Sequence, residues 1–328
     1  MTEKLKILVL IKPFWMYAKH KPKFEMIQSL EKYADVYYWY QDGHIKDILK
    51  RLKIRPHFIF HYDIAWNYGL APKIDGLADI DCLKGCFVID LHWKPEERKR
   101  YFRQNKIDLI FSATKHPFLK VFPQYKQKLR WLPWAINPAI MKDWKQKKDI
   151  DSLLMGLVYI NPEKKGPFNL PAKIPPKGRY AFRDAVFNKM KNEPGFVFHP
   201  HPGHRVEQSS NLLVNEKYAQ ELNRAKLFFT CGSRNQAGGV AVMKFFEAPA
   251  CHTLLLAEPN KDIQSLGFVN EKNYIACSTG NLKEKAKFYL NHDSERKRIT
   301  KNGYTFIHNH HTNDQRAKYM INAIKANL

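Results

Sequence analysis

The chain has 328 residues, of which 44% are apolar and 13% aromatic, so it is long enough for about two domains and rich enough in apolar side chains to build their cores. Its 55 Lys and Arg residues against 31 Asp and Glu give a net charge of +24, shared almost evenly between residues 1–150 (+13) and 151–328 (+11). This composition excludes a disordered or fibrous chain, and positive charge in both halves favours a polyanionic partner such as nucleic acid, an anionic membrane surface or a phosphate-bearing polymer.

Residues 1–147 alternate short apolar runs with polar, amphipathic stretches. Strands are predicted at 5–11, 36–40, 57–61, 87–91, 107–112 and 131–135, and helices at 23–33, 45–52 and 95–104. Such strand–helix alternation favours a parallel sheet covered by helices on both faces. The lysine-rich segment 143–151 lacks apolar periodicity, and we expect it to lead into a second domain.

The pattern then restarts. Strands are predicted at 153–160, 195–199, 227–231 and 253–257, and helices at 180–191, 216–224, 240–250, 282–291, 294–303 and 312–326, with a Pro- and Lys-rich loop at 161–178. The sequence thus predicts an α/β protein with two doubly wound domains, at 1–147 and 148–311, followed by a helix within 312–328. Ligands of such sheets sit beyond the carboxyl ends of the strands.

Several classes of protein and site are not supported by the sequence. No apolar run approaches the roughly 18 to 20 residues of a membrane helix, and Ile7–Ile11 is too short for a signal-peptide core. The five cysteines are scattered without CxxC spacing, and neither a P-loop nor a GxGxxG fingerprint occurs. We therefore expect no metal, a reducing cytoplasmic compartment and, at most, peripheral contact with the inner face of a membrane.

Six segments in the second half match motifs of a known family in order and spacing over about 110 residues. They are Tyr218–Phe229, Lys244–Cys251, Thr253–Ala257, Asn281–His292, Glu295–Gly303 and, last, His311-Thr312 ahead of Arg316-Ala317. They resemble the C-terminal lobe of group-1 glycosyltransferases, especially the CgeB-like, spore-maturation branch. In the first half, Leu132–Pro138 resembles the end of the N-terminal lobe, and Asp90–Trp93 its acceptor-side loop. The resemblance implies a GT-B fold: two Rossmann-like domains facing a cleft, with the C-terminal helix packing back on the N-terminal domain.

The resemblance also implies roles for single residues on the donor side. Glu247 takes the place of a glutamate that holds the two ribose hydroxyls of the nucleotide, a role suited to an acceptor-only carboxylate. Lys244 stands where an arginine commonly faces the diphosphate, and it keeps the charge but loses the bidentate fork. The loop that feeds this helix contains Ser233, Arg234, Gly238 and Gly239, whose glycines and amides suit phosphate. A helix-surface glutamate and an ordinary turn are the simpler explanations.

Two positions depart from the family pattern. Retaining relatives often carry a second glutamate eight residues before the ribose-binding one, and Gly239 stands there. The family's Ala-Cys-Gly becomes Ala-Cys-His, so that His252 replaces a glycine. The first departure weakens the assignment of a retaining course, and the second brings an imidazole near the nucleotide or to the protein surface.

The remaining candidates are polar residues near strand ends. Asp90 and His92 follow an apolar run and would share one face in extended chain, where either could take a proton from an acceptor hydroxyl or steady the transferred sugar. A hydrogen-bonded loop pair is the alternative. His199 and His201 follow another predicted strand and are expected to line the nucleotide or sugar pocket, and Arg183 could contact phosphate or simply be solvated.

We therefore expect a metal-independent, retaining glycosyltransferase that moves a sugar from a nucleoside-diphosphate sugar, such as a UDP-sugar, to a hydroxyl. The donor is its nucleotide-sugar substrate, and no tightly bound cofactor is expected. The D-x-D patterns at 79–81 and 149–151 and the histidines near 308–311 are not expected to bind metal.

The acceptor is left open between two polyanionic partners. One is a cell-surface polymer or lipid-linked glycan at an anionic membrane, on which the basic aromatic segment 118–134 could rest. The other is DNA, with a phage-type enzyme glycosylating a flipped hydroxymethylated base. A third reading is a nucleic-acid-binding protein that has lost catalysis, and a lysine-rich host proteome would also explain the charge.

Overall fold

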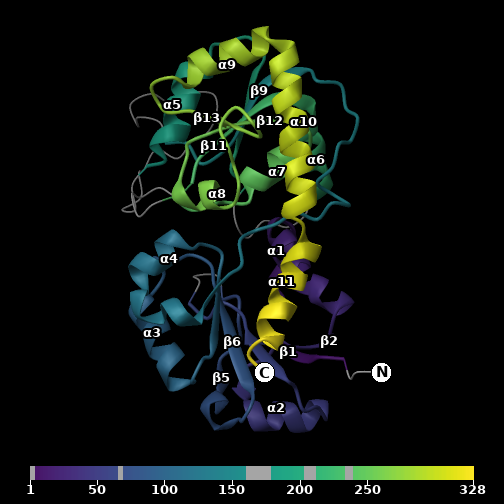
Figure 1. The fold of residues 1–328 in the computed structure, drawn as a ribbon, viewed down its shortest axis with the longest axis vertical. Helices are drawn as coiled ribbons and strands as arrows, with labels where there is room; N and C mark the ends of the chain where they lie inside the picture. Colours follow the sequence, from purple (N-terminus) through teal and green to yellow (C-terminus); the bar gives the residue numbers. More distant parts are fainter. Residues whose placement is uncertain (1–3, 66–68, 160–178, 203–211, 233–238) are drawn as a thin grey trace. The chain divides into compact units, whose positions relative to one another are not determined.

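The computed structural model describes residues 4–65, 69–159, 179–202, 212–232 and 239–328. The chain forms two compact units, each with a parallel sheet (Figure 1). Unit 1 comprises Met1–Met16, Lys23–Pro133 and Asn313–Leu328, and unit 2 comprises Tyr17–Pro22 and Trp134–Thr312. Within the described residues, no helix is long and apolar enough to cross a membrane.

The sheet of unit 1 has six parallel strands in the order β2-β1-β4-β6-β7-β8. These strands are β1 (Lys6–Leu10), β2 (Asp35–Trp39), β4 (Phe58–His61), β6 (Leu83–Val88), β7 (Leu109–Ser112) and β8 (Leu129–Trp131). A small second sheet pairs β3 (Gly43–His44) with β5 (Ile74–Asp75). The helices are α1 (Lys21–Gln28), α2 (Ile45–Leu52), α3 (Pro95–Gln104), α4 (His116–Val121) and α11 (Asn313–Lys325), with 3-10 turns η3 (Ser29–Lys32) and η5 (Pro123–Lys128).

Helices cover the unit 1 sheet because its strands are apolar on both sides. One buried cluster joins Leu8, Leu10 and Ile59 of the sheet to Ile45 and Ile48 of α2. Another joins β6 and β7 to α3, α4 and η5. Helix α11, drawn in yellow in Figure 1, contacts η3, so the last helix of the chain packs on the first unit.

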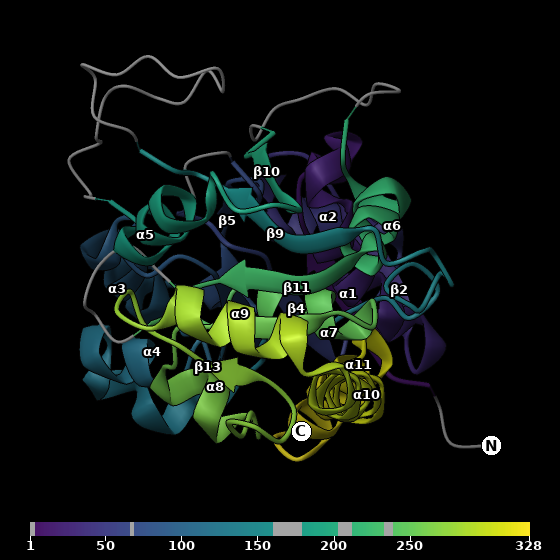
Figure 2. The ribbon, with the colours of Figure 1, turned by 90° about the horizontal axis from the view of Figure 1, so that it is seen from above.

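The sheet of unit 2 has five parallel strands in the order β10-β9-β11-β12-β13. These strands are β9 (Ile150–Gly156), β10 (Phe196–Pro200), β11 (Ala225–Thr230), β12 (Leu254–Ala257) and β13 (Ile275–Ala276). The helices are α5 (Ala181–Met190), α6 (Asn215–Arg224), α7 (Lys244–Ala250), α8 (Lys261–Ser265), α9 (Leu282–Asn291) and α10 (Asp293–His310), the last seen end-on in Figure 2.

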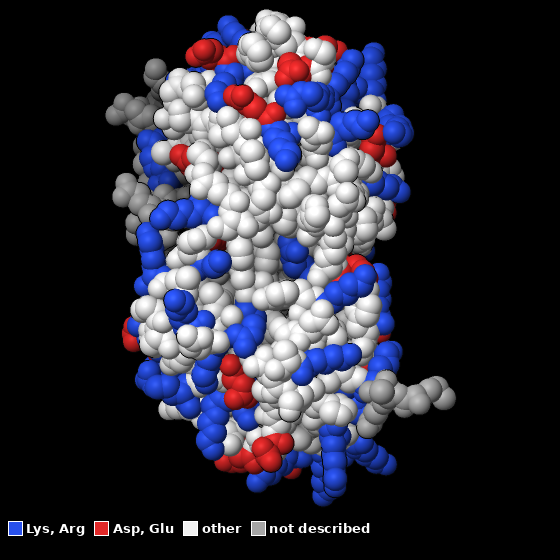
Figure 3. Space-filling model, viewed as in Figure 1, with Lys and Arg blue, Asp and Glu red and all other residues white. Residues whose placement is uncertain are grey.

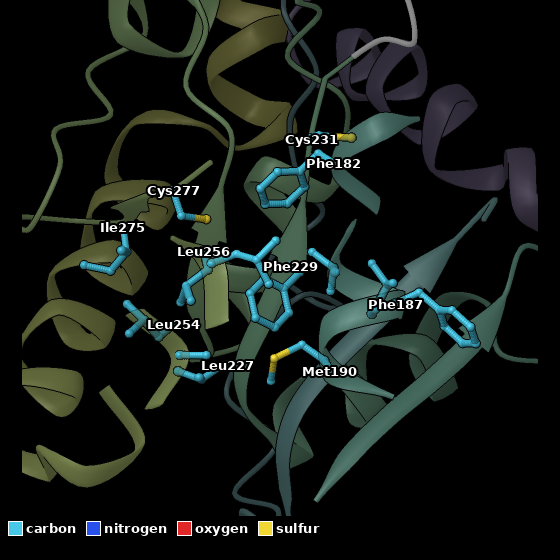
Figure 4. Packing of buried hydrophobic residues seen from close by; sticks show 14 of the residues in the cluster. Phe182, Phe187, Met190, Leu227, Phe229, Cys231, Leu254, Leu256, Ile275 and Cys277 are labelled. Carbon is cyan, nitrogen blue, oxygen red and sulfur yellow. The ribbon is translucent and has the colours of Figure 1, made fainter. Parts of the chain in front are cut away.

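Side-chain alternation along β11 divides the core of unit 2. Leu227 and Phe229 point into a cluster with Phe182, Phe187 and Met190 of α5 (Figure 4). Helix α9 also contributes residues to this cluster. The intervening Phe228 is fully buried on the opposite side, where α6 and α7 contact β11. The candidate residues of α7 therefore lie against the second face of the sheet, close to the carboxyl ends of its strands.

The strands and helices confirm the predicted α/β alternation, but several boundaries were predicted wrongly. The strand expected at 87–91 is β6, which ends at Val88 because residues 90–93 form a turn. The helix expected at 240–250 begins only at Lys244, and α10 runs to His310 rather than ending at 303. His308 and His310 therefore lie in the last turn of α10, and the final helix, α11, begins after them at Asn313. The loop predicted at 161–178 lies outside the described residues.

The segment expected to be a linker is fastened to unit 2. The side chain of Asn223, fully buried on α6, accepts from the amide of Gln146 (2.9 Å) and donates to Asp143 (3.1 Å). Lys148 Nζ donates to the carbonyls of Ala225 (3.0 Å) and His252 (2.7 Å). Several hydrogen bonds thus attach residues 143–149 to the rest of unit 2.

Candidate functional site

Lys244 and Glu247 occupy the first turn of α7, three residues apart and therefore on one face of the helix. The neighbouring Phe245, Phe246 and Ala248 are fully buried and anchor the helix to the core. Because apolar residues hold the rest of the helix, both charged side chains are drawn into a largely dehydrated region between α6, α7 and the sheet.

Lys244 is a partly buried cation. Its Nζ donates to the carbonyl of Met155 at 2.8 Å, near the end of β9, and lies 5.5 Å from the ring centre of Tyr218 and 5.7 Å from that of Phe228. The pKa of Lys244 is lowered from 10.5 to about 7, mainly by burial and also by the nearby charge of Arg183, while the charge of Glu247 opposes the shift. If an anion were bound beside this amine, the amine would hold its proton more firmly.

Glu247 is only 7% exposed, so it is not a helix-surface glutamate. The hydroxyl of Tyr218 donates to its carboxylate at 3.1 Å. Burial raises the pKa of Glu247, while Lys244, the Tyr218 hydroxyl and the charge of Lys19 lower it. A buried carboxylate that accepts from one donor among the described residues keeps acceptor capacity for a ligand's hydroxyl groups.

Arg183 brings a second buried cation to the same region. It is 6% exposed, its guanidinium carbon lies 3.9 Å from the ring centre of Tyr180, and its Nε has no acceptor among the described residues. Gly156 ends β9 with a φ of +150°, and a Cβ there would approach Arg183 Nη1 to 3.1 Å. The glycine leaves room for the guanidinium beside the strand end.

The two predicted histidines have different surroundings. His199 Nε2, on β10, lies 2.7 Å from Glu221 Oε1, and Glu221 also accepts from Arg224 at 2.8 Å, so His199 belongs to a hydrogen-bond network with two residues of α6. His201 contacts the amine of Lys19. Lys19 comes from Tyr17–Pro22, the short early segment that belongs to unit 2. The sequence analysis did not predict Lys19 or Tyr218 as site residues. Their places beside His201 and Glu247 depend on contacts between segments that are far apart in the sequence.

The two departures from the family pattern have backbone explanations. Gly239 has a φ of +63°, and a Cβ there would lie 2.5 Å from the Cβ of Asn260, so this backbone excludes a glutamate side chain. His252 follows the end of α7 with a φ of +56°, a left-handed conformation usual for glycine at this point of a helix end. Its ring contacts Tyr304 edge-on.

Three further candidates, Ser233, Arg234 and Gly238, lie outside the described residues. The predicted glycine pair does not directly precede a helix, because residues 240–243 separate Gly239 from α7. Among the described residues, no three His, Cys, Asp or Glu side chains are grouped so as to hold a metal ion.

Asp90 and His92 belong to unit 1, at the carboxyl end of its sheet. They are not alternate residues of an extended strand: the amide of Trp93 donates to the carbonyl of Asp90 at 3.1 Å, which closes a turn. His92 is exposed and Asp90 partly buried. The pKa of Lys23 on α1 is lowered from 10.5 to about 8, mainly by burial. The negative charge of Asp90 opposes this lowering. The extended geometry predicted for this pair is therefore wrong, although both residues lie at the expected edge of the sheet.

Comparison with known proteins agrees with this architecture. Residues 183–322 match a family described as glycosyl transferase-like. A glycosyltransferase from Rickettsia africae is similar in structure, with a TM-score of 0.60 at 9% identity over 99% of this chain and 98% of that one. Sucrose-phosphate synthase from Thermosynechococcus elongatus gives 0.59 at 10% identity over 99% of both chains.

A third solved structure carries a nucleotide-sugar. Anabaena HepE in complex with UDP-glucose has a TM-score of 0.56 at 8% identity, over 98% of this chain and 100% of that one. No sequence among the curated proteins matches the chain. Likeness over whole chains at such low identity shows a shared fold, and the two Rossmann-like units with parallel sheets are its parts. The chain has the GT-B fold.

Proposed function

We propose that this protein is a glycosyltransferase that binds a nucleoside-diphosphate sugar, with UDP-glucose as the first donor to test. Its match to a glycosyl transferase-like family over residues 183–322 and the UDP-glucose complex of HepE support this class of donor. The observation that carries the proposal is a trio of charged side chains near the carboxyl ends of β9 and β11: the buried Glu247 and Arg183 and the partly buried Lys244. Such a group is costly to bury unless a charged ligand completes it.

Each member of the trio has a role in this proposal. Glu247 accepts hydrogen bonds from the two ribose hydroxyls, and Tyr218 fixes its carboxylate. Lys244 and Arg183 neutralise the diphosphate as the bond to the sugar breaks, so the departing charge is stabilised by fixed cations without a metal. In a largely dehydrated site this stabilisation exceeds what the same charges give in water.

Groups of unit 1 complete the reaction in this proposal. Asp90 or His92 takes the proton of the acceptor hydroxyl as the new glycosidic bond forms. Gly239 stands where retaining relatives place a second glutamate, so a retaining course would have to proceed without that carboxylate. Product stereochemistry, read by NMR from the anomeric signal, decides between the two courses.

For the acceptor we propose an anionic or membrane-associated glycan. On the face shown in Figure 3, Lys and Arg side chains are more widespread than acidic ones over each unit. In the region of the predicted basic aromatic segment, exposed basic side chains project from α3, α4 and η5: Arg100, Arg103, Lys120 and Lys126. Such a surface attracts anionic lipid headgroups.

The even charge of the two halves also favours DNA as a second candidate acceptor. Binding to anionic vesicles and to duplex DNA across a salt series separates the two. Tight DNA binding that collapses steeply with salt, beside weak vesicle binding, would replace the glycan proposal with the DNA one.

Donor binding is tested by titrating UDP and UDP-glucose into the wild-type protein and into Glu247→Gln by calorimetry. Loss of hydrogen bonds from a charged acceptor should weaken binding by about 10- to 100-fold. Glu284→Gln, an exposed residue of α9, is the matched control and should bind as the wild type does. Wild-type protein that binds no nucleoside diphosphate, or equal binding by Glu247→Gln, would remove the basis of the proposal.

A further inference from the structure

A fully buried ion pair lies at the carboxyl end of the unit 1 sheet. Asp63 lies two residues after the end of β4, and Arg98 lies on α3, with their side chains 0% and 1% exposed. Arg98 Nη2 lies 3.0 Å from one carboxylate oxygen of Asp63 and 3.1 Å from the other. None of the roles assigned so far uses this pair.

Both members of the pair are also bonded to the backbone of the segment that carries Asp90 and His92. Asp63 accepts from the amide of Ile89 at 2.8 Å. Arg98 Nε donates to the carbonyl of Trp93 at 2.9 Å, and its Nη2 donates to the carbonyl of Asp90 at 3.2 Å. The turn is therefore held at its entry, at its first residue and at its end by one ion pair.

Stability alone does not account for this arrangement. A buried ion pair is a poor stabiliser, because apolar residues of similar volume often serve as well or better. Arg98 Nη1 is also buried without an acceptor among the described residues, which adds a desolvation cost. Only a guanidinium can donate at once to a carboxylate and two separate carbonyls from a planar fork. The side chain of Arg98 is thus suited to fixing the conformation of the backbone segment that it contacts.

We propose that Arg98, anchored by Asp63, is a positioning residue that fixes the Asp90–Trp93 turn and so sets the places of Asp90 and His92 in the reaction. This role rests on the proposed function. Without the guanidinium fork the turn keeps its own hydrogen bond and the bond from Ile89 to Asp63, but it loses its two hydrogen bonds from α3.

The test is Arg98→Lys, which keeps a cation beside Asp63 but cannot reach all three acceptors together. Arg100→Lys, an exposed position on the same helix, is the matched control. Hydrogen–deuterium exchange of peptides covering 89–94 should rise in Arg98→Lys and not in the control, while β1 stays protected in both. For UDP-glucose hydrolysis, we expect kcat to fall about 10- to 100-fold with KM unchanged, since misplaced reacting groups slow the chemical step.

Unchanged exchange at 89–94, or a raised KM at constant kcat, would overturn the positioning role. Exchange that rises throughout unit 1 would show a purely structural role, and Asp63→Asn then repeats the test with the fork intact and its anchor weakened. Wild-type protein that hydrolyses no UDP-glucose counts against the proposed function, and the exchange of 89–94 then decides the positioning role alone.

Discussion

Replacing Lys244 by Met should make the unliganded protein more stable while impairing its binding of nucleotide. Methionine fills a similar volume, keeps contact with Tyr218 and Phe228, and carries no charge to desolvate. The lowering of the Lys244 pKa from 10.5 to about 7 sets an upper limit of about 5 kcal/mol, at about 1.4 kcal/mol per unit. Because the side chain keeps some contact with solvent and loses one hydrogen bond on replacement, we expect a gain of about 2 kcal/mol at pH 7.

The pH dependence gives this prediction its sign. With a folded pKa near 7 and an unfolded value of 10.5, the unfolded state binds more protons between these limits. The free energy of unfolding of the wild type therefore rises with pH from 7 to about 10, by up to about 1.4 kcal/mol per pH unit relative to Lys244→Met. The advantage of the variant should shrink over this range and disappear above it.

Urea unfolding at pH 7, 8, 9 and 10 measures the difference directly, and UDP titration at pH 7 measures the loss of binding. Lys261→Met, at an exposed position on α8, is the control and should change neither quantity. A variant that is less stable than the wild type at pH 7, or whose advantage does not fall with pH, would refute the assignment of Lys244 as a strongly desolvated cation.

Two further predictions concern backbone conformation. His252→Gly should raise the free energy of unfolding by about 1 kcal/mol, because it relieves a left-handed residue at φ +56°; a loss of stability in thermal unfolding would show that the imidazole contacts outweigh the strain. Gly239→Ala should lower stability by about 1 to 3 kcal/mol, because φ is +63° and the new Cβ would lie 2.5 Å from Asn260. Gly280→Ala, where the nearest atom is 3.5 Å away, is its control and should unfold within about 0.5 kcal/mol of the wild type.

Local sequence signals predicted the bounds of a helix correctly where a residue such as proline marks its end. The helix predicted at 95–104 matches α3 because Pro95 stands at its first turn, and those predicted at 45–52 and 282–291 coincide with α2 and α9. The start of α7 was missed because Val240–Met243 are apolar and fit a helical pattern equally well. Periodicity cannot tell a helical residue from an apolar residue in extended chain over four positions.

The candidate site was predictable only in part, because burial and long-range pairing leave little trace in a sequence. The resemblance pointed to Lys244 and Glu247, but nothing local distinguishes a buried glutamate from a surface one. Lys19 is separated from Glu247 by most of the chain, so its approach depends on Tyr17–Pro22 belonging to unit 2. The turn at Asp90 was read as extended because its hydrogen bonds to Arg98 come from a helix farther along.

The place of α11 in unit 1 affects the order in which the two units become complete during synthesis. Unit 1 begins the chain, yet it receives α11 only after residues 134–312 have been synthesised. Until then Tyr33 lacks the carboxylate of Asp314, 2.5 Å away in the finished protein, and the carbonyl of Pro133 lacks its 2.8 Å partner Arg316. Although domains usually mature from the N-terminus, on the ribosome unit 2 has all of its residues before unit 1 does, so unit 1 is completed after the unit that follows most of it in the sequence.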